Sequence, residues 1–152
     1  MKNVLLYGAG TQSTGLLLMM LDGKIDIKPD MVIFSDTFSE PRFVMDYFWK
    51  VFEYVMDKYD CNIKMEWKSQ SGGLACDTLY DNDKRVASLP LFTGNGGMIR
   101  RQCTMEYKIN PATKRIKEEF NIGRKNKKSV PVVNRMFGIS LDEIERTRLS
   151  ND

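Results

Sequence analysis

The chain opens with a short apolar run that leads directly into small residues and then into helix-capping side chains. Residues 3–7 have the length and composition of a buried strand, and Gly8-Ala9-Gly10 follow at once. Thr11-Gln12-Ser13-Thr14 supply hydroxyls that favour a helix start, and apolar residues continue to Leu21. This succession is typical of parallel α/β folds and constrains the fold class more than any other feature.

The same alternation recurs along the first half of the chain. Residues 31–35 and 63–67 are further strand candidates, and a helix is expected between them over 41–59, with Pro41 in its first turn. Strands that alternate with helices through short connections predict a parallel sheet whose loops after each strand share one edge. The apolar rhythm of the long helix predicts that its core face consists of Phe43, Val44, Tyr47, Phe48, Val51, Phe52, Val55 and Met56.

The second half is less regular. Residues 68–102 lack periodicity, and a loop of this length inside a compact domain is usually functional or mobile. A helix is expected over 107–120 despite Pro111, and a fourth strand over 130–133 or 135–139. Ser140-Leu141-Asp142-Glu143 resembles a capping box that opens a final helix. We expect one domain of 152 residues, an α/β doubly wound, mostly parallel sheet with helices on both faces.

Composition excludes several kinds of chemistry. The sequence has no histidine, which rules out His-based acid–base catalysis and His-ligated metals. Its cysteines are Cys61, Cys76 and Cys103, without any C-x-x-C pair, so this chain alone provides neither a zinc site nor an iron–sulfur cluster. The longest apolar run, residues 16–21, falls far short of the about 20 residues that a membrane helix needs. We expect a cytoplasmic protein with no membrane contact.

The glycine turn suggests an anion site. Small residues allow a ligand to approach the backbone closely, and the amides and dipole at a helix start attract negative charge. The turn is not a P-loop, because no lysine precedes Ser13 and Thr14. A dinucleotide fingerprint is matched only in part, since Ser13 stands at its third glycine, although Asp36 after the second strand keeps a Rossmann dehydrogenase open. A tight turn without a ligand is the remaining alternative.

The segment from Tyr7 to Thr14 resembles the pyrophosphate loop of the PP-loop superfamily, usually S-G-G-x-D-S. That superfamily has the adenine nucleotide alpha-hydrolase-like fold and includes ATP pyrophosphatases and phosphoadenosine phosphosulfate (PAPS) reductases. The loop is closer still to the G-G-x-Q-S-T loop of reductase-like proteins of bacteria and phages. Gly8-Ala9 replaces Ser-Gly of the usual pattern, and Gln12 replaces Asp.

Two more segments carry the resemblance. Residues 33–37 with Glu40-Pro41 resemble the F-x-D-T-G-x-E segment of the second strand, with Phe38 in place of the usual glycine. Arg101-Gln102-Cys103-Thr104 with Lys108 and Pro111 resemble an R-x-C-x-x-x-x-K-x-x-P segment. The chain is short at its C-terminal end relative to the family, which suggests a shortened form or a pocket completed by homo-oligomerisation.

The resemblance implies an adenine nucleotide, ATP or PAPS, as ligand and sulfur metabolism or adenylation as context. In this family ATP is typically cleaved between its α and β phosphates while an acceptor is adenylated. The implied roles fall into three groups. Phosphates would be cradled by Gly8, Ala9, Gly10, Thr11, Gln12, Ser13 and Thr14. The adenine and ribose would be bordered by Phe34, Ser35 and Asp36. Charge would be neutralised by the catalytic residues Arg101 and Lys108, with Arg115 as a helper.

The charged and sulfur-bearing residues each have a second interpretation. Asp36 and Glu40 form a candidate Mg²⁺ site, or else an Asx turn followed by a favourable helix N-terminal charge. Cys103 is a candidate redox thiol or a small buried residue. Residues 100–128 hold ten basic and three acidic side chains although the whole chain carries only +3, and the cluster at 124–128 is a solvated loop or a polyanion contact.

Three functions therefore remain open at this level, and a Rossmann dehydrogenase is the weakest rival because it gives no role to Arg101 and Lys108. The first is an ATP pyrophosphatase that adenylates an unidentified acceptor, and the second is PAPS-reductase-like thiol chemistry that needs a partner or a missing tail. The third is a nucleotide-binding or sequestering module without turnover. A nucleic-acid acceptor is compatible with the sequence but nothing in it supports one.

Overall fold

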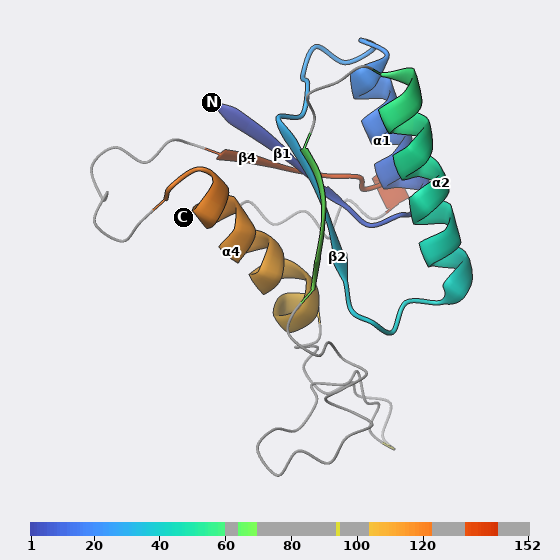
Figure 1. The fold of residues 1–152 in the computed structure, drawn as a ribbon, viewed down its shortest axis with the longest axis vertical. Helices are drawn as coiled ribbons and strands as arrows, with labels where there is room; N and C mark the ends of the chain where they lie inside the picture. Colours follow the sequence, from blue (N-terminus) through green and yellow to red (C-terminus); the bar gives the residue numbers. More distant parts are fainter. Residues whose placement is uncertain (60–63, 70–93, 95–103, 123–132, 143–152) are drawn as a thin grey trace.

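The computed structural model describes residues 1–59, 64–69, 94, 104–122 and 133–142. Four strands are described: β1 (Lys2–Tyr7), β2 (Met31–Asp36), β3 (Lys64–Ser69) and β4 (Val133–Phe137). The helices are α1 (Thr11–Leu21), α2 (Arg42–Lys58), a π-helical segment η1 (Thr104–Ile109) and α4 (Asn110–Glu119). The described part is thus an α/β fold in which strands and helices alternate (Figure 1).

The strands form one parallel sheet in the order β3-β2-β1-β4. β1 pairs with β2 on one side, with Tyr7 opposite Phe34, and with β4 on the other, with Leu5 opposite Met136. The chain therefore adds β2 and β3 in one direction from β1 and then reverses to place β4 on the other side. In open α/β sheets, ligands commonly bind at the carboxyl ends of the two strands between which such a reversal occurs, here β1 and β4.

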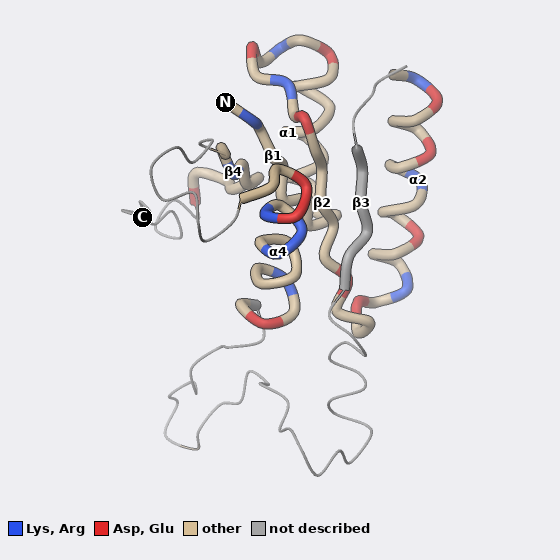
Figure 2. Tube along the Cα trace, turned by 60° about the vertical axis from the view of Figure 1, so that its left-hand side comes forward, with Lys and Arg blue, Asp and Glu red and all other residues tan. Residues whose placement is uncertain are grey.

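Helices cover both faces of the sheet (Figures 1 and 2). On one face α1 and α2 contribute Leu17, Phe48, Val51 and Val55 to a core with Leu5, Tyr7, Val32 and Phe34. On the other face Ala112 and Ile116 of α4 pack against Val4, Met31 and Ile33. Because successive strand residues point to opposite faces, the apolar residues 31–34 of β2 supply both cores, as expected for a parallel sheet covered on both sides.

The expected elements lie close to the observed ones. The first three strands and the first two helices shift by four residues or less at their ends, and β4 spans parts of both segments proposed for a fourth strand. The helix expected over 107–120 is continuous with η1, and Pro111 stands in the first turn of α4. Proline there lacks an N–H that the helix start would leave unbonded in any case. Leu141 and Asp142 form a short 3₁₀ turn, and Glu143 lies outside the described residues.

The predicted core face of α2 is wrong in part. Phe48, Val51 and Val55 are buried, but Phe43 is 73% exposed, and Tyr47 and Met56 are exposed as well. The eight apolar positions wrap around more of the helix than one sheet face can cover. The sheet therefore buries the middle of the stripe and leaves its flanks at the surface.

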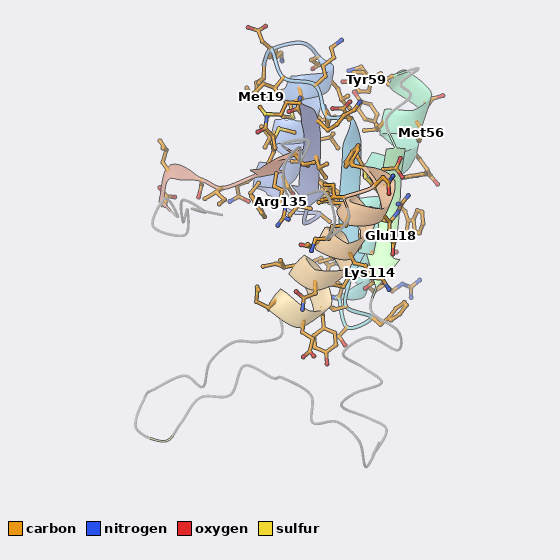
Figure 3. The ribbon with its side chains drawn as sticks, turned by 90° about the vertical axis from the view of Figure 1, so that its left-hand side faces the viewer. Met19, Met56, Tyr59, Lys114, Glu118 and Arg135 are labelled. Atoms are coloured by element: carbon orange, nitrogen blue, oxygen red, sulfur yellow. The ribbon has the colours of Figure 1, made fainter. Side chains whose placement is uncertain are left out.

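The C-terminal ends of α1 and α2 are tied together, far from the carboxyl edge of the sheet. Tyr59, which caps α2, donates a hydrogen bond of 2.5 Å to Asp22, which caps α1, and Lys58 lies 3.5 Å from the same carboxylate. The hydrogen bond from Tyr59 holds the pKa of Asp22 below its usual value. Figure 3 shows Tyr59 at one end of the molecule and Lys114 of α4 toward the other.

Candidate functional site

The turn between β1 and α1 is held by the hydroxyl of Ser13. Its Oγ accepts hydrogen bonds from the amides of Gly10 (3.2 Å) and Gly8 (3.4 Å) and lies 3.1 Å from the carbonyl of Gly10. Ala9, between the two glycines, has a φ of +52°, in the left-handed region that favours glycine. The first intrahelical hydrogen bond runs from Thr14 N–H to Gly10 O, so the amides of Thr11, Gln12 and Ser13 have no partner within the helix itself.

Thr14 anchors the same helix start to the strand. Its Oγ1 lies 2.9 Å from the hydroxyl of Tyr7, and this hydrogen bond is buried. Burial raises the pKa of the Tyr7 hydroxyl, and the hydrogen bond to Thr14 opposes that effect. Ser13 and Thr14 are both buried, whereas Thr11 and Gln12 are exposed. The hydroxyls of Ser13 and Thr14 therefore stabilise the turn, and the exposed surface above it consists of backbone and the side chains of Thr11 and Gln12.

Strand β4 reaches the same turn from the other side. Gly138 follows β4 directly, and a Cβ placed on it would lie 2.4 Å from the backbone nitrogen of Ser13. Only a glycine allows the two backbones to approach this closely. The carboxyl end of β4 thus lies against the first turn of α1, at the point where the strand order reverses.

The loop after β2 has its own set of internal hydrogen bonds. The carboxylate of Asp36 accepts from the amide of Phe38 at 2.7 Å, which is an Asx turn, and Thr37 Oγ1 accepts from the amide of Ser39. Phe38 has a φ of +55°, and its side chain is exposed. The Asx-turn interpretation of Asp36 is confirmed.

Lys108 joins this loop from a distant part of the sequence. Its ammonium lies 2.7 Å from Oε1 of Glu40, and its carbonyl accepts a hydrogen bond of 3.0 Å from the hydroxyl of Ser35. Thr37 donates to the same Glu40 oxygen at 3.2 Å. The ion-pair partner of Glu40 in this structure is therefore Lys108. Among the described residues no group of three or more acidic or cysteine side chains could hold a metal ion.

Among the other expected site residues, Phe34 lies in the core and Arg115 lies on α4. The ring of Phe34 is buried and stacks on Phe48 with centroids 4.4 Å apart, so this ring belongs to the core and does not face a ligand. Arg115, on α4, forms an ion pair of 2.7 Å with Glu119 one helical turn later. Arg101 and Cys103 lie outside the described residues, as does the basic cluster at 124–128.

Two contributors to this region were not expected from the sequence as site residues. Gly138 carried a signal, since a glycine directly after an apolar strand often marks a close backbone approach. Tyr7 carried a weaker one, as a polar group at the end of an otherwise apolar strand. Their partners, Ser13 and Thr14, lie in the glycine turn, but the pairing of Gly138 with Ser13 bridges more than a hundred residues and has no local signature.

The described residues thus place three of the sequence segments at the carboxyl edge of the sheet. The glycine turn follows β1, the Asx-turn loop follows β2, and Lys108 comes from η1. Helix-start amides and an ammonium group can bind an anion, and the exposed Thr11 and Gln12 can donate further hydrogen bonds. Comparisons with protein-family models, with curated proteins and with solved structures find no match. No described helix has the length and apolar character required to cross a membrane.

Proposed function

We propose that this chain binds an adenine nucleotide, ATP or PAPS, as a PP-loop protein with a doubly wound sheet. The observation that carries the proposal is that the glycine turn, the Asx-turn loop and Lys108 all lie at the carboxyl edge of the sheet, where the strand order reverses between β1 and β4. Open α/β sheets bind their ligands at that place. The proposed ligand phosphates would lie over the amides of Thr11 and Gln12.

The backbone at two positions supports the resemblance on which the ligand class rests. Ala9 and Phe38 stand where the family motifs have glycine, and both have a φ near +50°. Glycine adopts this conformation without strain, whereas other residues adopt it rarely. The loops therefore keep a shape that suits the family's glycines although the glycines themselves have been replaced.

The proposed roles of the residues in the glycine turn differ from those expected from the sequence. Ser13 and Thr14 hold the turn in place, and the exposed backbone amides would contact phosphate. Lys108 would neutralise negative charge, and Asp36 fixes the loop that carries Glu40. Catalysis of α–β phosphate cleavage with adenylation, or of PAPS-reductase-like chemistry, would rest on positioning and electrostatic stabilisation. A binding or sequestering module without turnover is the alternative.

The test is a calorimetric titration of the full chain with ATP and Mg²⁺, with PAPS and with NAD, combined with an assay of released pyrophosphate. ATP binding with pyrophosphate release supports the adenylating enzyme, and binding without release supports the sequestering module. PAPS binding alone supports the reductase-like branch. Binding of NAD alone contradicts the proposal and returns the Rossmann alternative.

The Lys108→Ala variant identifies the site within the same experiment. Loss of one ammonium contact to phosphate should weaken nucleotide affinity at least about tenfold, since a charge-assisted hydrogen bond contributes about 1.5–3 kcal/mol. Lys28→Ala is the matched control, because Lys28 is exposed in the loop before β2, at the opposite edge of the sheet. Equal affinity in both variants would remove Lys108 from the site.

A further inference from the structure

The ammonium of Lys108 already has an anionic partner within the chain. Its distance to Glu40 Oε1 is 2.7 Å, and the Lys108 side chain is 45% exposed while that of Glu40 is 16% exposed. Glu40 is also held by the hydroxyl of Thr37. Glu40 is the less exposed of the two and contacts both Lys108 and Thr37, so its carboxylate is held in place. The longer and more exposed lysine side chain is the one that can move toward a ligand.

Because Lys108 is paired with Glu40, a phosphate at the carboxyl edge of the sheet encounters an ion pair and not a free ammonium group. A phosphate that approaches Lys108 must either separate the ion pair or share the ammonium with a neighbouring carboxylate. Both arrangements oppose binding, the first because an existing interaction is lost and the second because like charges repel at short range. The contact between Ser35 and the Lys108 carbonyl keeps the backbone of η1 next to the loop, so the competition is built into the fold.

We propose that Glu40 is an internal competitor for Lys108 and so determines how tightly the site binds phosphate. This inference rests on the proposed function, because it concerns the same site. It assigns Glu40 a role opposite to that of a magnesium ligand: a metal ligand would strengthen the binding of a magnesium nucleotide, whereas the competitor weakens it. The sign of the effect of one substitution therefore separates the two roles.

The experiment measures ATP, PAPS and inorganic pyrophosphate affinity by calorimetry, with and without Mg²⁺, for the full chain and four variants. Glu40→Gln preserves shape and removes the charge, and we expect it to tighten binding of ATP about three- to tenfold. Lys108→Met should weaken binding about tenfold. The double variant should match Lys108→Met within about twofold, because without the lysine there is nothing to compete for.

The control for the charge change is Asp30→Asn. Asp30 also forms an ion pair of 2.8 Å with a lysine, but it lies before β2, at the opposite edge of the sheet. The Asp30→Asn substitution removes one negative charge, as Glu40→Gln does, and should leave the affinity for ATP and pyrophosphate unchanged. Circular dichroism of every variant establishes that the fold is retained.

The outcomes separate the two proposals. If the wild-type chain binds ATP and Glu40→Gln binds it equally or more weakly, the competitor role is wrong and nucleotide binding stands. If the gain from Glu40→Gln persists without Lys108, the lysine does not mediate it and the inference is again wrong. If no variant binds ATP, PAPS or pyrophosphate, the proposed function fails and the inference fails with it.

Discussion

At the scale of single residues, the loop after β2 contains an aromatic residue in a backbone conformation that suits glycine. Phe38 has a φ of +55° with its side chain 45% exposed. A left-handed conformation costs a non-glycine residue about 1–2 kcal/mol, whereas glycine loses more chain entropy on folding, about 0.5–1 kcal/mol. Phe38→Gly should therefore change the free energy of unfolding by less than about 1 kcal/mol.

A branched residue at the same position provides the contrast. Phe38→Val should lower the free energy of unfolding by about 1–2 kcal/mol, because β-branched side chains fit the left-handed region worst. Urea denaturation of both variants measures the difference. Equal stability of the glycine and valine variants would mean that the loop relaxes to another backbone conformation when Phe38 is replaced.

At the scale of elements, the contact between β4 and α1 depends on a glycine. A methyl group on Gly138 would meet the Ser13 backbone at 2.4 Å, and backbone atoms cannot turn aside as a side chain can. Gly138→Ala should lower the free energy of unfolding by about 1–3 kcal/mol or more. Gly15, inside α1 and exposed, has no neighbour within 4 Å of its added Cβ.

Gly15→Ala is therefore the matched control and should have the opposite effect. Alanine in a helix interior is more favourable than glycine by about 0.5–1 kcal/mol, so the variant should be more stable. Thermal and urea unfolding of both alanine variants compare the two positions. A Gly138→Ala variant as stable as the wild type would show that β4 can move away from α1 without cost.

Elements are also where sequence patterns were most informative. Short apolar runs and the rhythm of α2 predicted strands and helices, because these patterns are local and a few neighbouring residues determine them. The place of β4 beside β1, the pairing of Lys108 with Glu40 and the burial of Phe34 were not predictable in this way. Each depends on which distant segment packs nearby, and no local pattern records that. The predicted core face of α2 failed at Phe43 for the same reason.

At the scale of the whole molecule, the amino edge of the sheet is joined by a polar network that should make stability depend on pH. Asp30 accepts from the Lys2 ammonium (2.8 Å) and the Asn3 amide (2.8 Å), and Asn134 of β4 donates to Asn3. The hydrogen bonds from Lys2 and Asn3 hold the pKa of Asp30 below its usual value. This stabilisation is present above about pH 4 and is lost as the pH falls through the lowered pKa.

Asp30→Asn removes that contribution. We expect the variant to lose about 0.2–1 kcal/mol of unfolding free energy at pH 7, since the pair is partly exposed, and to approach the wild type near pH 2. Urea titrations at both pH values measure the difference. The Asp26→Asn variant changes an exposed carboxylate of the same loop and serves as control. A stability gap that stays constant down to pH 2 would contradict the assignment to Asp30 ionisation.

The pairing of β4 with β1 also has a consequence for folding during synthesis on the ribosome. Asn3 and Asn134 are hydrogen-bonded partners 131 positions apart, so β1, α1, β2 and α2 leave the exit tunnel long before β4 is made. Until then β1 has one unpaired edge, and no glycine backs the first turn of α1. The contact between Gly138 and the first turn of α1 can therefore form only after Gly138 has left the exit tunnel.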